Sequence, residues 1–211
     1  MRLIDTHSHL FLEEFSEDFP QVIERARAAG VTHIFMPNID STTIEAMLSA
    51  CSLYKGYCFP MIGLHPTSVN ANYEKELEIV ARELKFSKEY VAIGEIGMDL
   101  YWDKTYLKEQ QIVLDKQVNW ALEYDLPVVI HCRDAFDYIY KVLEPYKKTP
   151  LRGIFHSFTG TAEEATRVLE FSDFFIGING VVTFKKSHLP EILAGIPLEK
   201  IVLETDYHYL T

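Results

Sequence analysis

Short apolar runs alternate with amphipathic segments along the whole chain, and this alternation constrains the fold more than any other feature of the sequence. The apolar runs have the composition of β-strands, and the intervening segments carry apolar residues at helical spacing. We expect eight strands, at Leu3–His9, Val31–Met36, Tyr57–Leu64, Tyr90–Glu95, Pro127–His131, Arg152–His156, Phe174–Ile178 and Lys200–Asp206. We expect seven helices, at Phe15–Ala29, Ser41–Ala50 (N-cap Ser41 or Thr42, with Glu45 in a capping box), Tyr73–Leu84, Thr105–Tyr124, Ala135–Tyr146, Thr161–Phe171 and Ser187–Ala194.

The order of these elements points to an α/β protein with parallel strands. Runs such as Val128–Ile130 and Ile201–Leu203 are apolar at successive positions, as in strands buried on both faces of a parallel sheet. Such alternation gives either a doubly wound sheet or a (β/α)8 barrel, and eight repeats favour the barrel. We therefore predict one (β/α)8 TIM-barrel domain over residues 1–211. The sequence stops at Thr211, directly after the eighth strand, so we expect the eighth helix to be missing or truncated.

Charge and cysteine content narrow the class of partner and the compartment. A net charge of −11 argues against a broad basic surface that follows a nucleic-acid backbone. The three cysteines, Cys51, Cys58 and Cys132, have no zinc-finger or thioredoxin spacing. No apolar stretch approaches the ~18–20 residues of a membrane span, and the N-terminus lacks a secretion signal. We expect a cytoplasmic protein with reduced thiols.

Residues that can bind metal stand at the end of one expected strand after another. They are His7, His9, His65, Glu95, His131, His156 and Asp206. His7 and His9 are two residues apart, so a strand would present both imidazoles on one face. In a barrel, the C-terminal ends of all strands meet at one mouth, where active sites lie. The sequence therefore predicts a cluster of these side chains at that mouth.

The mixed nitrogen and oxygen ligands indicate a divalent metal ion. Imidazole and carboxylate suit Zn²⁺ or Mn²⁺, and Mg²⁺ fits where substrate phosphate adds oxygen ligands. Six ligands are too many for one tetrahedral ion, so we expect two ions that share a carboxylate, with Glu95 as the bridge. Two such ions can activate water and stabilise the leaving oxygen of a phosphoester.

Six ordered motifs carry a family resemblance. They are His7-Ser8-His9, Gly63-Leu64-His65-Pro66, Gly94-Glu95-Ile96-Gly97-Met98-Asp99, His131-Cys132-Arg133-Asp134-Ala135, Phe155-His156-Ser157-Phe158-Thr159-Gly160 and Glu204-Thr205-Asp206. Over residues 1–206 the chain resembles the TatD family of metal-dependent hydrolases, which is related to the amidohydrolase superfamily. The resemblance implies a (β/α)8 barrel and a divalent-metal-dependent deoxyribonuclease.

The resemblance also implies roles for individual residues. His7, His9, Glu95 and Asp206 would hold one metal ion, and Glu95, His131 and His156 the other. Asp206 would orient or deprotonate the attacking water, and His65 would contact the scissile phosphate. Arg133 is placed to bind the same phosphate, with an ion pair to Asp134 or another acid as the alternative.

A few positions depart from the family or stay open. Family members usually carry a small residue and a proline after the Glu-Thr-Asp motif, whereas this chain continues with Tyr207-His208-Tyr209-Leu210-Thr211. We expect His208 to be a surface residue rather than an extra ligand, and His33 to be a packing residue. Tyr101 and Trp102 could either stack a nucleobase or cover the metal site. Lys185 and Lys186 could approach a phosphate, but we favour a solvated loop for them.

The leading hypothesis is a cytoplasmic, monomeric enzyme that cleaves DNA from single strands or ends. It would use two divalent metal ions, Mg²⁺ or alternatively Zn²⁺ or Mn²⁺. Its catalytic residues would be Asp206, Glu95 and His65. A hydrolase of a small ester, amide or phosphoester is the second hypothesis. A non-catalytic metal-binding barrel is the third.

Overall fold

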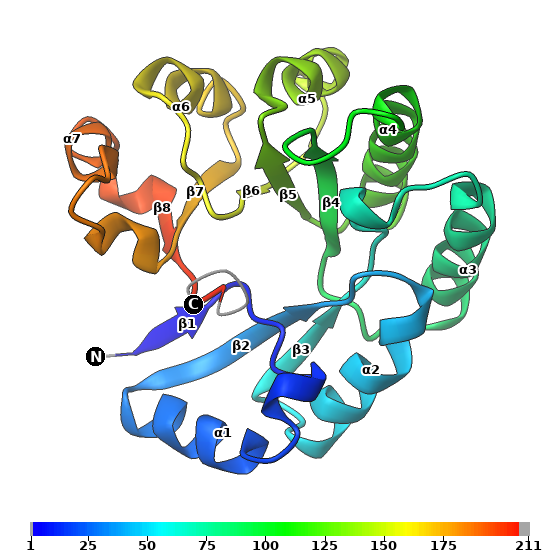
Figure 1. The fold of residues 1–211 in the computed structure, drawn as a ribbon, viewed down its shortest axis with the longest axis vertical. Helices are drawn as coiled ribbons and strands as arrows, with labels where there is room; N and C mark the ends of the chain where they lie inside the picture. Colours follow the sequence, from blue (N-terminus) through cyan, green and yellow to red (C-terminus); the bar gives the residue numbers. More distant parts are fainter. Residues whose placement is uncertain (1, 207–211) are drawn as a thin grey trace.

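The computed structural model of the chain describes residues 2–206, in which parallel strands follow one another around a ring, seen end-on in Figure 1. The strands are β1 (Leu3–Asp5), β2 (Val31–Pro37), β3 (Cys58–Met61), β4 (Ile93–Asp99), β5 (Val128–Arg133), β6 (Gly153–Phe155), β7 (Phe174–Ile178) and β8 (Ile201–Leu203). The helices are α1 (Phe19–Ala28), α2 (Ile44–Leu53), α3 (Tyr73–Phe86), α4 (Leu107–Glu123), α5 (Phe136–Leu143), α6 (Ala162–Val168) and α7 (Leu189–Leu193). The predicted α/β barrel is confirmed, whereas His208 lies outside the described residues.

Two sheets complete the ring, one of β1 to β3 and one of β4 to β8. At one seam, Ile62 N donates to Ala92 O at 3.2 Å and Gly94 N donates to Ile62 O at 2.9 Å. At the other seam, Thr6 N donates to Leu203 O at 3.0 Å. The ends of the described chain therefore lie side by side, and the segments after β1 and β8 border the same central space.

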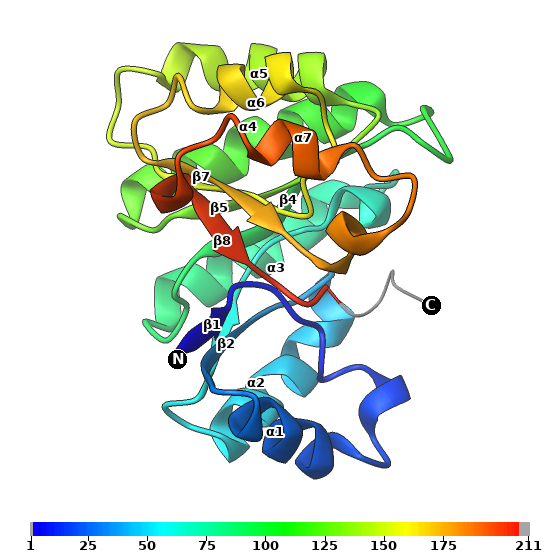
Figure 2. The same cartoon turned by 90° about the vertical axis from the view of Figure 1, so that its left-hand side faces the viewer.

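The helices pack around the outside of the ring, as Figures 1 and 2 show. Ile34, Leu114 and Ile139 are fully buried members of the core between strands and helices. No α-helix follows β8 within residues 2–206, and Ile4 and Leu203 are about half exposed on that side. Within the described residues, no helix is both long and apolar enough to cross a membrane.

Several predicted boundaries are wrong. Helix α1 begins at Phe19 rather than Phe15, because Glu13–Phe15 forms a separate 3₁₀ turn. The predicted Ser41 or Thr42 cap with Glu45 is replaced by a capping box of Asp40 and Thr43 on the 3₁₀ turn before α2. Strand β4 begins at Ile93 and extends to Asp99, so Glu95 lies inside it and not at its end.

Candidate metal centre

The predicted residues come together at the C-terminal ends of the strands. His7 and His9 follow β1, His65 follows β3, Glu95 lies in β4, His131 in β5, His156 follows β6 and Asp206 follows β8. All seven side chains are buried, and His7 is the most enclosed with no exposed surface. Buried ionisable groups need partners or metal ions, so this gathering is a candidate metal centre.

Glu95 stands in the middle of the cluster, and its two oxygens face different imidazoles. Oε2 lies 3.0 Å from His7 Nε2 and 3.4 Å from His9 Nε2. Oε1 lies 2.8 Å from His131 Nδ1, 3.3 Å from His65 Nε2 and 3.5 Å from His156 Nε2. The Glu95 carboxylate therefore faces five imidazoles, two of them near Oε2 and three near Oε1.

Three groups of donor atoms are close enough to share a cation. They are His7 with His9 and Glu95, His65 with Glu95 and His131, and His7 with His156 and Asp206. Asp206 Oδ2 lies 3.5 Å from His156 Nε2, so Asp206 is grouped with His156 rather than with His9. His65, one of the residues predicted to be able to bind metal, has a phosphate contact as the role that the family resemblance implies, and it is itself one of the grouped donors.

The donor set fits divalent cations in chemistry and in spacing. Ligand atoms held about 2.0–2.2 Å from one ion stand about 2.8–3.6 Å from each other in tetrahedral or octahedral geometry. His7 Nε2 and His9 Nε2 are 3.1 Å apart, and their distances to Glu95 fall in the same range. Within residues 2–206, the buried Asp206 Oδ1 has no hydrogen-bond partner, which is costly unless a ligand completes the site.

Burial and mutual charge set the protonation of these groups. Burial lowers the pKa of His7 to about 4 and also lowers the pKa of His65. Burial would lower the pKa of His156 as well, but the Glu204 and Glu95 carboxylates outweigh it and raise that pKa to about 10. The metal-free centre therefore holds protons that a cation can replace.

The imidazoles surrounding Glu95 have the opposite effect on its carboxyl group. Burial would raise the pKa of Glu95, but the nearby His65 and His7 rings hold it well below its ordinary value. Glu95 is therefore ionised across the physiological pH range and presents two negatively charged oxygens to the imidazoles around it.

Two carboxylates behind the ligands were missed by sequence reasoning. Asp99 Oδ2 lies 2.9 Å from His131 Nε2, so the ring of His131 is held between Asp99 and Glu95. Glu204 Oε2 lies 3.2 Å from His156 Nδ1, and Glu204 Oε1 accepts a hydrogen bond from Ser157 N. Both residues belong to motifs that carry the family resemblance, Gly94–Asp99 and Glu204-Thr205-Asp206. Membership of these motifs is the sequence signal that could have identified them.

Asn179 is a further missed residue, and it holds Asp206 from the β7 side. Its Nδ2 lies 3.3 Å from Asp206 Oδ2 and 2.7 Å from Ser157 Oγ. Asp206 N also donates to His7 O at 3.1 Å, which ties the residue to the segment after β1. These contacts fix a carboxylate that lies outside any strand.

A cavity of about 300 Å³ opens over the cluster. It is lined by His131, Cys132, Arg133, His156, Ser157, Thr159, Val181 and Asp206. Arg133 forms part of its wall, and its guanidinium makes no salt bridge with Asp134 among the described residues, although its charge helps to lower the pKa of Asp99. The cavity over the centre is therefore lined by a cation.

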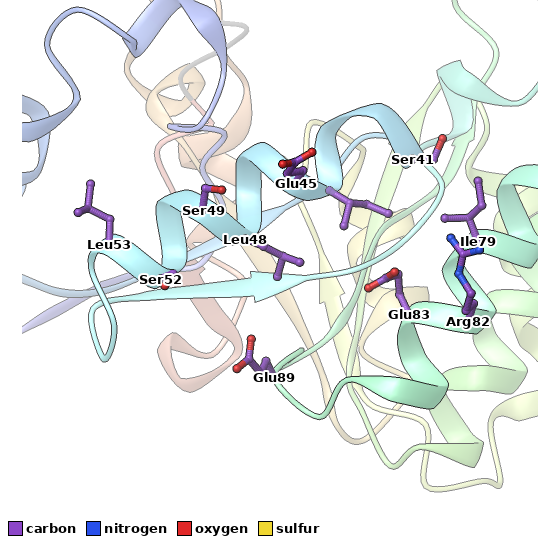
Figure 3. A pocket seen from close by; sticks show the side chains of 11 residues that line it. Ser41, Glu45, Leu48, Ser49, Ser52, Leu53, Ile79, Arg82, Glu83 and Glu89 are labelled. Atoms are coloured by element: carbon purple, nitrogen blue, oxygen red, sulfur yellow. The ribbon is translucent and has the colours of Figure 1, made fainter.

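The remaining candidates lie away from the cluster. His33 is half-buried in β2 and stacks on Phe59. Lys185 and Lys186 are exposed in the segment between β7 and α7. An open groove of about 970 Å³ lies between α2 and α3 on the outside of the ring (Figure 3), and none of the clustered residues lines it.

The sequence matches the family model described as TatD related DNase over residues 4–211. A Bacillus subtilis (strain 168) protein named uncharacterized metal-dependent hydrolase YabD is 36% identical over 99% of this chain and 81% of its own length. A Pantoea sp. (strain At-9b) protein named 3'-5' ssDNA/RNA exonuclease TatD is 33% identical over 99% of this chain and 80% of its own. The crystal structure of YjjV, a TatD homologue from Escherichia coli K12, superposes with a TM-score of 0.89 at 32% identity, covering 97% of this chain and 79% of that one.

Proposed function

Because this chain belongs to the TatD-related DNase family of metal-dependent hydrolases, we propose that it removes nucleotides from the ends of single-stranded DNA by hydrolysing phosphodiester bonds. The Pantoea relative is named for exonuclease action on both ssDNA and RNA, and this supports a single-stranded substrate. The observation that carries the proposal is Glu95, whose two oxygens face two sets of imidazoles below an open cavity.

The donor atoms divide into two sets around Glu95. His7, His9 and Oε2 would hold one divalent cation, and His65, His131 and Oε1 a second. Bound divalent cations neutralise phosphate charge and lower the pKa of water, with Mg²⁺ as the proposed ion and Mn²⁺ or Zn²⁺ as alternatives. His156 and Asp206, which are grouped with His7, would complete the ligands of these cations. His156 Nε2 lies 3.5 Å from both Glu95 Oε1 and Asp206 Oδ2.

Asp206 is the proposed general base. Its Oδ2 is held near Asn179 and His156, whereas its buried Oδ1 has no hydrogen-bond partner among residues 2–206. Asp206 lines the cavity over the centre, and its free Oδ1 can accept the proton of the attacking water. Arg133 would bind the scissile phosphate through the planar donors of its guanidinium, whereas His65, which is assigned to the second cation, would contact that phosphate only through the cation.

We further propose that residues 1–211 act as one catalytic domain, as a monomer in the cytoplasm. Contacts between the segments after β1 and β8 support a single domain. All three cysteines are free thiols, which suits a reducing compartment.

The test is stepwise shortening of end-labelled single strands by metal-stripped protein to which Mg²⁺, Mn²⁺ or Zn²⁺ is returned. DNA, RNA and blunt duplex are compared in parallel. Glu95→Gln and Asp206→Asn should each lower kcat at least about 10³-fold, because each removes a charge at the reacting centre. Glu45→Gln, which removes an exposed carboxylate on α2, is the matched control and should keep full activity.

A small ester, amide or phosphoester is the alternative substrate class. The cavity over the centre, about 300 Å³, is at the lower end of the range for small-molecule sites. Metal-dependent cleavage of small esters without shortening of any strand would replace the nuclease proposal. Metal binding without turnover on any of these substrates would favour a non-catalytic barrel.

A further inference from the structure

Two aromatic side chains at the mouth are exposed although their neighbours in the chain are buried. Trp102 is 79% exposed and Tyr101 is 50% exposed, whereas Met98, Asp99 and Leu100 are buried. Their rings meet edge to face with centroids 4.6 Å apart. A side chain that covered the metal centre would itself be largely buried, so Trp102 does not act as a cover.

The aromatic pair is anchored directly to the metal centre. Tyr101 N donates to Asp99 Oδ1 at 3.1 Å, and the other oxygen of Asp99 lies 2.9 Å from His131 Nε2. Three residues of backbone therefore connect Asp99, which contacts the grouped donor His131, to the exposed indole. A ligand on Trp102 would therefore lie close to the metal centre.

Arg133 joins the aromatic pair to the cavity. Its guanidinium lies 4.0 Å from the Tyr101 ring centroid and 5.8 Å from that of Trp102. A guanidinium stacked on a ring keeps its in-plane N–H donors free for a phosphate. Since Arg133 also lines the cavity over the centre, those donors are available beside the scissile bond.

We propose that Tyr101, Trp102 and Arg133 form a subsite for one unpaired nucleotide next to the scissile bond, with its base stacked on Trp102 and its phosphate on Arg133. Bases in a duplex stack on each other and present only their edges, whereas an unpaired base offers a face to the indole. The subsite, which rests on the proposed nuclease function, would make the enzyme select single-stranded ends.

The charge of the molecule makes such a contact necessary. With a net charge of −11, long-range attraction does not draw a polyanion toward this protein. Stacking is independent of base sequence and is only weakly opposed by that charge. A flat aromatic contact therefore supplies affinity that the surface charge does not.

Fluorescence tests the contact without relying on cleavage. The chain has two tryptophans, and Trp120 lies half-buried on α4, so Trp120→Phe leaves Trp102 as the reporter. A single-stranded phosphorothioate oligonucleotide, which resists hydrolysis, is titrated with Mg²⁺ present. We expect quenching by this strand and little by the same strand with abasic terminal positions, while Trp102→Phe, which keeps only Trp120, shows none. Equal quenching by both strands, or none, overturns the subsite.

Kinetics supply the second readout. Trp102→Ala should raise KM for single-stranded DNA about 5- to 150-fold, the range for losing one stacked base. That increase should vanish on strands that are abasic beside the scissile bond. Phe86→Ala is the matched control, because Phe86 is 77% exposed at the end of α3 that points away from the mouth. An unchanged KM for Trp102→Ala in an active enzyme contradicts the subsite. Quenching by the phosphorothioate strand, combined with no cleavage of the ordinary phosphodiester strand of the same sequence, contradicts the proposed function instead.

Discussion

At the scale of single residues, two carboxylates hold the ring of His131 in position. Glu95 lies against Nδ1 at 2.8 Å and Asp99 against Nε2 at 2.9 Å. Burial would raise the pKa of Asp99, but the hydrogen bond to His131 outweighs it and lowers that pKa, so Asp99 stays ionised beside the ring. Asp99 thus orients a grouped donor from behind, as carboxylates behind metal-binding histidines commonly do.

Replacing Asp99 by Asn should weaken metal binding without unfolding the protein. Asn keeps an oxygen for Tyr101 N but removes the negative charge that orients His131. We expect metal affinity or kcat to fall about 10- to 100-fold. Calorimetric titration with Mn²⁺ measures the affinity, and Asp103→Asn, an exposed change in the next loop, is the control. Equal affinity in both variants would remove this role from Asp99.

Metal binding should release protons and strengthen as pH rises. The pKa of about 10 for His156 in the metal-free protein means that this ring is protonated at pH 7, and a cation requires the neutral ring. Affinity therefore rises with pH until that pKa is passed. Titration of Mn²⁺ into weakly buffered protein should acidify the solution. Glu204→Gln, which removes the carboxylate next to His156, should release fewer protons.

At the scale of elements, strand order was predictable but strand ends were not. Apolar runs of the right length identified every strand, and β7 matches its predicted bounds. Strand β4 extends past Glu95 because residues 96–99 pair with 130–133 of β5. Gly, Glu and Asp are poor strand formers, and here tertiary pairing overrides that preference.

The same limit explains which site residues were missed. Grouping of His7, His9, His65, Glu95, His131, His156 and Asp206 followed from strand ends meeting at one mouth. Asp99 touches His131 only because the β4–β5 register places Gly97 opposite His131 and Asp99 opposite Arg133. The register between parallel strands leaves no local pattern in the sequence. The sequence therefore did not predict that Asp99 and Glu204 contact the metal-binding histidines.

Close packing of β4 against β5 gives a prediction for Gly97. A Cβ at this position would stand 2.0 Å from His131 O, and the residue has φ +140°. Gly97→Ala should destabilise the protein by more than about 3 kcal/mol, since backbone must move. Gly56→Ala shares the positive φ but meets nothing within 4 Å, so it should cost only about 1 kcal/mol. Urea unfolding of the two variants separates steric overlap from backbone strain, and equal losses would contradict the packing argument.

At the scale of the whole molecule, the centre joins strands that are far apart in sequence. Its donors come from the segments after β1, β3, β6 and β8 and from within β4 and β5. A cation bound there would link both sheets across the two seams of the ring. The unfolded chain scatters these donors, so the cation binds the folded state alone and stabilises it.

Metal should therefore raise the melting temperature, and Glu95 should be required. At a free metal concentration 100 times Kd, linkage gives about 2.7 kcal/mol, or a rise of roughly 5–10 °C for a chain of this size. Glu95→Gln leaves the imidazoles in place but removes the charge that both sets of donors share. Scanning calorimetry of metal-stripped and Mn²⁺-loaded protein should show the rise in the native chain and in Glu45→Gln, and little in Glu95→Gln. If Glu95→Gln showed the full rise in melting temperature, the stabilising cation would have to bind elsewhere on this acidic surface. The Glu95 carboxylate would then not be the charge through which a cation links the two sheets.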